Sequence, residues 1–587
     1  LFPSVKTGQS FHKLRRSCLR RGALFMDPLF PATAQSLFYK REPPPGLTWK
    51  RPREICKDPR LFVDGISTRD LHQGSLGNCW MVAAISCLSS EPSLWKKVIP
   101  DHVDQEWKTK DLDLYAGIFH FRFWRLGRWT DVVVDDRLPV SADGVLLFCR
   151  SATPREFWSA LLEKAYAKLN GCYEALEGGN TTEALIDFTG GVSEPLSLDR
   201  EALILHSDQR RAFFQTLAKA HERKALITCS IRPAEGEAME SLLDCGLVRG
   251  HAYGITAVRK VRLRETAPGW MSRLFMVRMR NPWGTTHWTG AWSQGSQQWQ
   301  QMSRAEREKT GLIVRDVGEF WMDFEDFCHY FTDVVVCRLV ERALLWPSSH
   351  WREVRLCDDC MDLFTCKEQE VLICLQQEDR RIRRKDGGGD NLPIGFEVLK
   401  VEVNRCSRVQ CVVEQAASSV YMDSRSVTLR GTLAPGRYVV LPTTFLPGVT
   451  GRFLLRLFCH SHCFLPQHTV VTTVHLRRAS GLSSPKQTDV YAIVRCEDDT
   501  VKTHVFKAEG NPEFNLRAVF YRRYPSTSIS IELWSRGRLW DCVLGEARIQ
   551  TTESERSRSH VIDLRGGQSR SGCVYVETSS SVCLTDL

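Results

Sequence analysis

The hydrophobic pattern of this chain changes near residue 345, and the change limits the folds that it can adopt. Before that point, a stretch with apolar residues at helical spacing (157–176) alternates with strand-like runs such as "YAGIFHFRFW". After it, short alternating strands separated by Gly and Pro turns continue to the end. A chain of 587 residues is also too long for one core, because domains usually hold ~100–200 residues. We therefore expect a multidomain protein, first α+β and then all-β, ending in two β-sandwiches.

Breaks in composition refine the domain boundaries. The chain opens on a basic stretch, and the glycine-bearing "DFTGGVSE" separates two halves of the α+β part. The expected parts are a basic N-terminal arm (1–22), a first lobe (23–190), a second lobe (191–341), a β-sandwich (345–465) and a final β-sandwich (466–587).

The composition is that of an ordinary globular protein and excludes several classes. The 22 cysteines are too few for a disulfide scaffold and form no two CxxC pairs at zinc-ribbon spacing, so we expect reduced thiols. No apolar run is long enough to span a bilayer, and no signal peptide is recognisable. The net charge of +10 is small for this length, and no nucleic-acid-binding motif is present, so no nucleic acid partner is expected. The basic runs 13–21 and 380–390 favour either an anionic surface or, more simply, solvated loops.

The stretch "DLHQGSLGNCWMVAAISCLSS" places Cys79 just before an apolar run at helical spacing. Alone, this cysteine is most simply one more buried thiol, because free cysteine is among the most buried residue types. A nucleophilic cysteine needs a histidine to exchange its proton and a third polar group to orient that imidazole. His251 in "GHAYGITAV" and Asn281 in "RNPWG" lie at the ends of expected strands, where a scaffold can hold a side chain still. The sequence thus offers a Cys79, His251 and Asn281 triad, split between the two lobes.

Two further residues fit such a site. Gln73 could donate its side-chain amide to an oxyanion together with the Cys79 backbone N–H, and Trp283 could shield the histidine–asparagine hydrogen bond from water. Lowering a thiol pKa from ~8.5 to ~3–4 requires about 7 kcal/mol. A helix N-terminus supplies only ~0.3–1 kcal/mol. We therefore expect His251, as an imidazolium, to hold Cys79 as a thiolate.

The blocks "QGSLGNCW", "GHAYGITAV" and "RNPWG" resemble the three active-site blocks of the calpain family, and "DVVVDDRLP", "FTGG" and "GEFWMDFEDF" also match. The resemblance runs from about residue 23 to 341 and continues beyond. It implies a two-lobed papain-like protease core, a calpain-type β-sandwich and then a C2-like domain, as in atypical calpains of the calpain-five type. It also implies Cys79 as nucleophile, His251 as general base and acid, Asn281 as the group that orients the imidazole, Gln73 in the oxyanion hole and Trp283 beside the cleft.

Asn78 departs from the aspartate that is common in the classical members of the family. The difference removes a charge beside the thiol, and we do not expect it to abolish the chemistry.

The resemblance further implies calcium as cofactor, bound once in each lobe. In the first lobe the matching positions are retained: Val63 and Gly65 would supply backbone carbonyls, and Asp70 and Glu156 carboxylates. We therefore expect a calcium site there.

The second-lobe calcium site is expected to be lost. His287, Gln294 and Val317 stand where the family pattern is acidic, and only Glu319 remains. Each lost carboxylate removes a strong attraction for the dication, since even one pair of unit charges is worth roughly 4 kcal/mol at 4 Å and intermediate dielectric. Arg315 is close in sequence, which suggests that a cation of the chain partly replaces the metal.

The C-terminal half carries two departures from the family. Only "CDDCMDLFTCKEQ" joins "HWREVRL" to "EVLICLQQ", and so short a connection suggests a missing edge strand in the first sandwich, which would expose unpaired backbone. In the C2-like segment Asp489 and Asp541 remain, but Ser535 and Gly537 stand where acids are expected. A module that binds membrane or protein with little calcium and a purely structural sandwich are equally open interpretations.

The function implied is that of a calcium-dependent intracellular cysteine endopeptidase that makes limited cuts in protein substrates through a thioester acyl-enzyme. The alternative is a non-proteolytic scaffold with an idle triad that binds cytoskeletal or membrane partners. A transglutaminase-like acyl transferase would want an acid where Asn281 stands. Besides protein substrates, an anionic membrane or phospholipid surface is a candidate partner, and no penta-EF-hand small subunit is expected. The expected location is the cytoplasm, with membrane association or the nucleus as alternatives.

Overall fold

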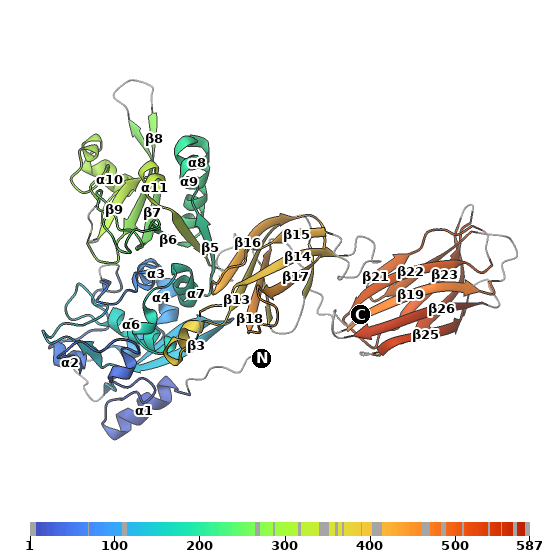
Figure 1. The fold of residues 1–587 in the computed structure, drawn as a ribbon, viewed down its shortest axis with the longest axis horizontal. Coiled ribbons are helices and arrows are strands. Elements are labelled where there is room, and N and C mark those ends of the chain that lie inside the picture. The colour runs from blue at the N-terminus through green and yellow to red at the C-terminus, as the bar shows by residue number, and fades with distance from the viewer. Residues whose placement is uncertain are drawn as a thin grey trace. The chain divides into compact units, whose positions relative to one another are not determined.

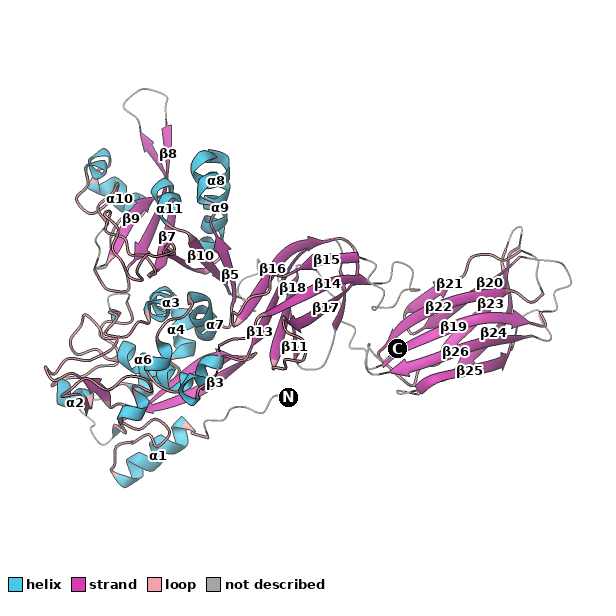
Figure 2. Ribbon diagram, viewed as in Figure 1, coloured by secondary structure: helices cyan, strands magenta, loops and turns pink. Residues whose placement is uncertain are grey.

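The computed structural model describes the chain in two compact units. It describes residues 8–581 apart from 68–69, 108–113, 265–270, 286–287, 315–317, 340–351, 358–361, 367–368, 389, 402–413, 460–469, 483–488, 508–509, 538–539, 553–554 and 567–571. Unit 1 is Leu1–Trp346 with Glu378–Asn391, and unit 2 is Pro347–Gln377 with Leu392–Leu587 (Figure 1). The α-helices among the described residues all belong to unit 1. The regular elements described in unit 2 are β-strands (Figure 2). No described helix has the length and apolarity needed to cross a bilayer.

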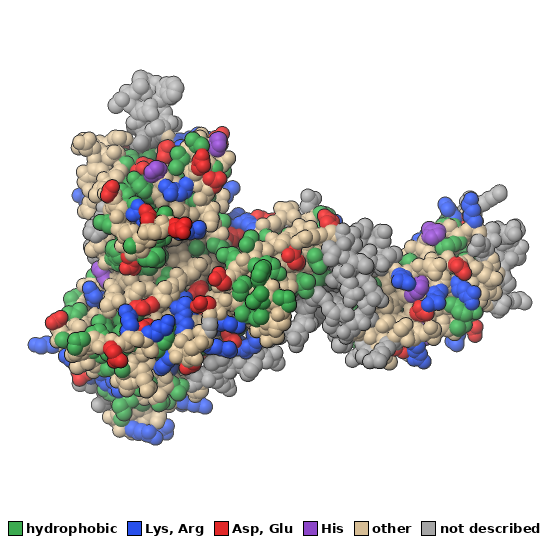
Figure 3. Space-filling view, viewed as in Figure 1, with side chains coloured by type: hydrophobic (Ala, Val, Ile, Leu, Met, Phe, Trp, Pro, Cys, Tyr) green, Lys and Arg blue, Asp and Glu red, His purple; other side chains and the backbone are tan. Residues whose placement is uncertain are grey.

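The first lobe of unit 1 is built around one fully buried helix, α3 (Cys79–Ser89). All eleven of its residues are buried, as expected for the sequence "CWMVAAISCLS", which is apolar on every side. Around it lie α1 (Phe11–Arg21), η1 (Ala34–Ser36), β1 (Thr48–Lys50), α2 (Pro52–Ile55), α4 (Pro92–Val98), α5 (His102–Gln105), β2 (Ile118–Arg125), β3 (Arg128–Asp135), β4 (Leu138–Val140), α6 (Trp158–Asn170), η4 (Glu174–Leu176) and α7 (Thr181–Thr189). The basic side chains of α1 form part of the surface of this lobe (Figure 3).

The second lobe is a six-stranded antiparallel sheet with helices packed on it. Its strand order is β5-β10-β6-β7-β8-β9. The strands are β5 (Val192–Ser197), β6 (Leu226–Ser230), β7 (Ala252–Arg264), β8 (Met271–Arg280), β9 (Glu319–Asp323) and β10 (Asp333–Arg338), and the helices are α8 (Arg200–Leu205), α9 (Ser207–Glu222), η5 (Gln297–Gln301), α10 (Arg304–Thr310) and α11 (Phe324–Tyr330). Because β7 and β8 are antiparallel neighbours, the start of β7 and the end of β8 meet at one edge of the sheet.

In one aromatic stretch of the second lobe a strand is followed directly by a helix. In "VGEFWMDFEDFCHYF" the strand β9 ends at Asp323 and α11 begins at Phe324. The Asp323 side chain accepts the backbone N–H groups of Glu325 and Asp326, which caps the new helix. The cap therefore decides where the strand ends.

Unit 2 contains two β-sandwiches. The first has sheets of order β11-β18-β13-β16 and β12-β17-β14-β15, and the second has sheets of order β22-β19-β26-β25 and β21-β20-β23-β24. Their strands are β11 (Arg352–Cys357), β12 (Asp362–Cys366), β13 (Gln369–Gln377), β14 (Ile394–Val401), β15 (Glu414–Ser418), β16 (Ser426–Leu433), β17 (Gly436–Thr444), β18 (Phe453–Cys459), β19 (Val470–Ser480), β20 (Val490–Cys496), β21 (Asp499–Lys502), β22 (Glu513–Arg522), β23 (Ile529–Ser535), β24 (Cys542–Ile549), β25 (Glu555–Asp563) and β26 (Cys573–Ser581).

The short connection in the first sandwich still supplies its edge strands. The expected gap would have removed one strand, but β11 pairs with β18 and β12 pairs with β17, one in each sheet. Each sheet therefore has four strands, and a missing edge strand is not what the shortening produces.

Residues 378–391 interrupt the sandwich sequence and group with unit 1. The sequence places them inside the expected domain 345–465, and they contain the basic run 380–390. The short helix η6 (Arg380–Asp386) buries Arg381 against the first lobe, where its guanidinium bonds to Glu183 at 2.7 Å and to the carbonyls of Ala175 and Gly178. This basic run is therefore not simply a solvated loop.

Candidate active site

The structure places Cys79 as the first residue of α3, with 9% of its side chain exposed. Its neighbour Asn78 does not cap the helix, because the Asn78 amide is turned into the core and donates to Glu163 at 2.7 Å. Burial raises the pKa of Glu163 to about 7. Asn78 is therefore next to Cys79 in the sequence, but its side chain is hydrogen-bonded to Glu163 in the core of the lobe.

His251 and Asn281 are brought together by the edge where β7 begins and β8 ends. His251 immediately precedes β7 and Asn281 immediately follows β8. His251 Nε2 lies 2.8 Å from Asn281 Oδ1, and the same oxygen accepts the backbone N–H of Trp283 at 3.0 Å. Since a backbone N–H can only donate, the amide oxygen must be the acceptor for Nε2 as well. Nε2 therefore carries a proton, and Nδ1 of the neutral ring is left with its lone pair.

The free nitrogen of His251 faces the thiol. His251 is fully buried, and its Nδ1 has no hydrogen-bond partner among the described residues. The ligand atoms of Cys79, His251 and Glu240 all lie within 4.8 Å of one another. A base with a free lone pair is thus close to the proton that it would remove, as general base catalysis requires.

Trp283 and Gln73 belong to the segments around His251 and Cys79. The Trp283 ring lies 4.5 Å from the His251 ring, centroid to centroid. The Gln73 backbone N–H donates to Pro282 O, which ties the segment before α3 to the turn that carries Trp283. The Gln73 side-chain amide donates to Leu76 O at 2.8 Å and retains a second N–H.

Cys79 and His251 both line a cavity of about 320 Å³ between the two lobes of unit 1. Trp80 and Asn180 border it from the first lobe, and Leu196 from the second. A cleft of this kind can receive an extended peptide with its carbonyl against the sulfur. The cavity thus gives the buried pair access to a substrate.

Burial favours the neutral forms of both groups in this substrate-free state. Burial raises the pKa of the Cys79 thiol, a backbone hydrogen bond from Ala252 opposes the shift, and the nearby Glu240 carboxylate adds to it. Burial also lowers the pKa of His251 to about 4, against an opposing effect of Asn281. The standing ion pair expected from the sequence is therefore disfavoured here, because both charges would lose their hydration.

The expected first-lobe calcium residues lie together. Glu156 Oε1 accepts the backbone N–H of Val63 at 2.6 Å, and Asp70, which is 3% exposed, contacts Glu156 through a side-chain hydrogen bond. Burial and the Asp70 charge raise the pKa of Glu156 to about 8. Gly65 follows Asp64 in the same turn, at φ 92°. Two buried carboxylates that repel each other fit the oxygen-rich site that calcium prefers.

The second-lobe positions look different. Glu319 is 5% exposed, and its Oε1 lies 3.6 Å from Arg278 Nε. Gln294 is exposed. His287, Arg315 and Val317 fall outside the described residues. A guanidinium of β8 therefore already compensates the one acid that remains, and it comes from a residue that the sequence did not single out.

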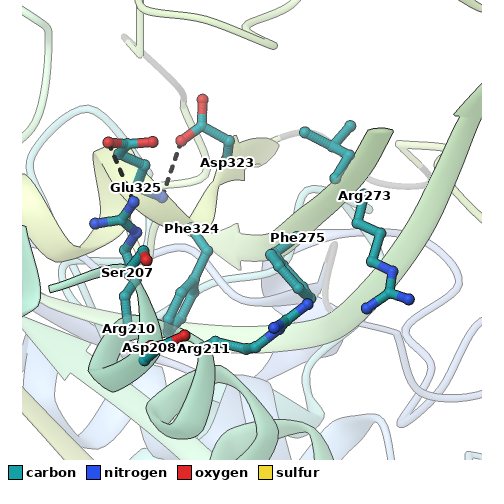
Figure 4. Close-up of a pocket in the computed structure, with 10 residues that line it drawn as sticks. Ser207, Asp208, Arg210, Arg211, Arg273, Phe275, Asp323, Phe324 and Glu325 are labelled. Carbon is teal, nitrogen blue, oxygen red and sulfur yellow. Dashed lines mark hydrogen bonds and ion pairs between the residues drawn. The ribbon is translucent and has the colours of Figure 1, made fainter. Parts of the chain in front are cut away.

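A second hollow in the same lobe involves none of the expected residues. It measures about 500 Å³ and lies among α9, β8 and α11. Arg211 and Arg273 are among the residues that line it, and Glu325 pairs with Arg210 on one side of it (Figure 4). Its mixed charges and its lack of a nucleophile–base pair distinguish it from the cleft at Cys79.

Two residues near the site were missed in the sequence. Arg381 stacks on the Trp80 ring, with 4.6 Å from its guanidinium carbon to the ring centroid, and an added Cβ at Gly179 would touch both side chains. Glu240 lies close to Cys79 and His251 and comes from the loop before His251. Only the unusual density of arginines in 380–384 could have drawn attention to the first, and no local signal marks the second.

The arrangement is that of a two-lobed thiol hydrolase, because a cysteine at a helix start meets a histidine–asparagine pair across a cleft. Comparison with known proteins agrees. The profile described as "Calpain family cysteine protease" matches residues 25–338, that of "Calpain large subunit, domain III" matches 353–458, and that of the C2 domain matches 470–564.

Two relatives match nearly the whole chain, and a third matches about three quarters of it. It is 46% identical to Calpain-5 of Mus musculus, over 98% of both chains, and 35% identical to Calpain-5 of Caenorhabditis elegans, over 95% of this chain and 94% of that one. It is also 39% identical to Calpain-9 of Rattus norvegicus, over 77% of this chain and 67% of that one. The chain therefore belongs to the calpain family of cysteine proteases.

This membership confirms the expected fold class and the expected enzyme class. The protein is a cysteine endopeptidase that acts on protein substrates, with a protease core followed by a calpain-type β-sandwich and a C2 domain. Calcium regulation is typical of the calpain and C2 domains that it contains. Nothing in these relationships favours the non-proteolytic scaffold.

Proposed function

We propose that this endopeptidase cleaves peptide bonds with Cys79, His251 and Asn281, and that calcium acts on its protease core through the first lobe alone. The observation that carries the assignment is the state of His251. Its Nε2 is fixed by Asn281, and its buried Nδ1 has no partner but lies near the Cys79 sulfur.

The chemical steps follow from this geometry. His251 Nδ1 takes the Cys79 proton as the sulfur attacks the scissile carbonyl carbon, so the sulfur gains a bond and the carbonyl oxygen becomes an oxyanion. The Cys79 backbone N–H and the second amide N–H of Gln73 stabilise that oxyanion. The imidazolium then gives its proton to the leaving amine, and a thioester remains. Water, deprotonated by the same nitrogen, hydrolyses the thioester and restores the thiol.

A neutral resting pair is compatible with these steps. The proton has to travel only from Sγ to Nδ1, and Asn281 remains hydrogen-bonded to Nε2 throughout. Entry of a substrate displaces water from the cleft and places its carbonyl against the sulfur, which favours the transfer at the moment of attack. Asn281 therefore acts by orienting the ring, as the third member of a triad does.

Calcium would be held in the first lobe by the Asp70 and Glu156 carboxylates with the Val63 and Gly65 carbonyls. Bound there, it would neutralise two carboxylates that now share a proton, and so fix the segment leading to Gln73. The support is the contact between the two buried acids. In the second lobe, the Arg278–Glu319 pair supports a core that needs no ion at that position.

The C2 domain supports a further part of the proposal, binding to an anionic phospholipid surface. Trp540 is 83% exposed in the loop between β23 and β24, and Asp541 of the same loop accepts hydrogen bonds from Tyr491 and Gly537. An exposed tryptophan suits a membrane interface because its ring is both apolar and polar. A cytoplasmic enzyme that moves to membranes is the location that fits this arrangement.

Cleavage of casein by the purified full chain, across a range of calcium concentrations, tests the proposal. Wild-type protein should cut in a calcium-dependent manner, the Cys79→Ala variant should lose the activity, and Glu319→Gln should leave the calcium dependence unchanged. Equal activity of wild type and Cys79→Ala would remove Cys79 as the nucleophile.

A further inference from the structure

The loop between β6 and β7 brings an acidic side chain to the catalytic pair. Glu240 lies in this loop, its backbone N–H donates to Arg249 O at 2.9 Å, and Leu242 forms a bridge with Val248. These contacts make the loop a narrow hairpin that ends just before His251. At φ 59° Glu240 adopts the left-handed conformation, which non-glycine residues rarely occupy and which tends to persist at functional sites.

The Glu240 carboxylate is poorly placed for catalysis but well placed as a ligand. Beside a thiol it opposes the formation of a thiolate, so it does not assist the nucleophile. It is exposed, and none of the described residues bonds to its carboxylate oxygens by a hydrogen bond or an ion pair. Close to the same sulfur, the buried His251 Nδ1 also has no hydrogen-bond partner among the described residues. Two groups with available lone pairs, the Glu240 carboxylate and His251 Nδ1, therefore lie close to the Cys79 sulfur.

We propose that Cys79 Sγ, His251 Nδ1 and the Glu240 carboxylate form a site for a Zn²⁺-type ion that shuts off the protease. The inference rests on the proposed roles of Cys79 and His251, and it adds Glu240 as the residue that turns a catalytic pair into a metal site. A thiolate, an imidazole and a carboxylate are the ligand types that zinc uses in proteins. Among the described residues, no other group of three or more such side chains brings its ligand atoms together in this way.

The distances allow such a site with a small movement. With metal–ligand distances of about 2.0–2.3 Å, the ligand atoms of a tetrahedral zinc site lie roughly 3.5 Å apart. Here the three atoms lie within 4.8 Å of one another, and Glu240 is on an exposed loop that can approach by the difference. Binding releases the thiol proton to solvent, and the two anionic ligands then balance the charge of the ion. Water completes the fourth position.

The ligand atoms at Cys79, His251 and Glu240 disfavour calcium, the ion that activates the enzyme in the proposed function. Calcium prefers six to eight oxygen ligands, so sulfur and nitrogen ligands disfavour it, whereas a transition ion of intermediate softness is favoured. Zinc would occupy the sulfur and the Nδ1 lone pair, which are the two groups that attack and proton transfer require. Calcium would thus activate the protein at the first-lobe site, and zinc would inhibit it at Cys79, His251 and Glu240.

Metal binding by the full chain tests this inference. The protein is freed of metal, reduced with a phosphine and kept in saturating calcium, and Co²⁺ is added as a spectroscopic probe before Zn²⁺ displaces it. Wild type should show a thiolate-to-cobalt charge-transfer band that Cys79→Ser lacks. Glu240→Gln should weaken Zn²⁺ binding at least ~10-fold, since even loss of an outer partner of a metal ligand costs ~10–100-fold. Glu235→Gln, the same change at an exposed position of the same loop, should bind as wild type does.

Casein cleavage in the same samples separates the two claims. Equal Zn²⁺ affinity of wild type and Glu240→Gln, or a cobalt band that survives in Cys79→Ser, would overturn the metal site while calcium-dependent cleavage left the protease assignment standing. The opposite outcome is metal binding that depends on Cys79 and Glu240 in a protein that fails to cleave casein even when zinc is absent. That result would support the metal site and refute the proposed protease chemistry.

Discussion

His251 Nε2 donates to Asn281 Oδ1 at 2.8 Å, and the backbone N–H of Trp283 fixes that oxygen from the other side. The amide cannot turn without losing one of these two bonds. The bond therefore sets the tautomer of the imidazole and turns its free nitrogen toward Cys79.

Replacing Asn281 by Ala should lower kcat/KM by ~10²–10³-fold, because the ring loses the partner that holds Nδ1 toward the sulfur. The loss should appear in kcat and leave KM almost unchanged, since Asn281 lies behind the histidine. Steady-state kinetics on a fluorogenic peptide measure both. A change confined to KM would mean that Asn281 serves substrate binding instead.

The Cys79 thiol should react as a protonated group in the resting protein. Its pKa is raised by burial, so the thiolate should appear only as the pH rises above the ordinary thiol range of ~8.5. Glu240→Gln removes a neighbouring negative charge and should move the curve to lower pH. The rate of iodoacetamide alkylation of Cys79, followed by mass spectrometry, gives the curve. A plateau that extends down to acid pH and disappears in His251→Gln would instead reveal a standing ion pair.

Calcium binding to the first lobe should release close to one proton at pH 7. The pKa of Glu156 is raised to about 8 by burial and by Asp70, so the ion-free pair holds a proton that a bound cation displaces. Calorimetry in buffers of different ionisation enthalpy measures the release. Glu156→Gln should abolish the proton-linked site, and Glu42→Gln, an exposed acid of the same lobe, should not. Proton release that persists in Glu156→Gln would place the site elsewhere.

Arg381 should be needed for the stability of unit 1. Arg381→Ala leaves Glu183 and two backbone carbonyls without their buried partner, and loss of one member of such a pair costs ~3–5 kcal/mol. Scanning calorimetry of the full chain should show a lower first transition. Arg383→Ala, which removes an exposed arginine of the same segment, is the control. Equal transitions in the two variants would show that the segment is not anchored by Arg381.

The exposed tryptophan of the C2 domain should carry membrane affinity. Trp540→Ala should reduce binding to phosphatidylserine vesicles, because the ring no longer enters the interface. Tyr524→Ala removes an exposed aromatic side chain from the loop before β23, at the opposite end of that strand from Trp540, and should have little effect. Vesicle co-sedimentation measures both variants. Undiminished binding by Trp540→Ala would favour the purely structural interpretation of the sandwich.

Much of the fold, and where the candidate residues lie on it, could be predicted from the sequence. The start of α3 at Cys79 and the strand ends at His251 and Asn281 are local features, visible as a change of period or a turn. The end of β9 at Asp323 is harder to recognise, because the aromatic run continues past it and only the Asp323 cap marks the start of α11.

The rest depends on contacts between distant segments. Arg381 lies in a run that looks like a solvated loop, and only folding places it on Trp80. Glu240 resembles any exposed acid until the loop closes beside His251. The protonation state of the catalytic pair likewise follows from burial, which motifs do not reveal.

The most direct test of the account is covalent labelling with a peptidyl epoxide, which reacts with a cysteine only where a neighbouring imidazole activates it. In saturating calcium, mass spectrometry of the full chain should find one adduct per molecule, on Cys79, and the adduct should be lost in His251→Ala. An adduct on Cys79 that forms equally well without His251, or one spread over other cysteines, would contradict the claim that this imidazole activates this sulfur.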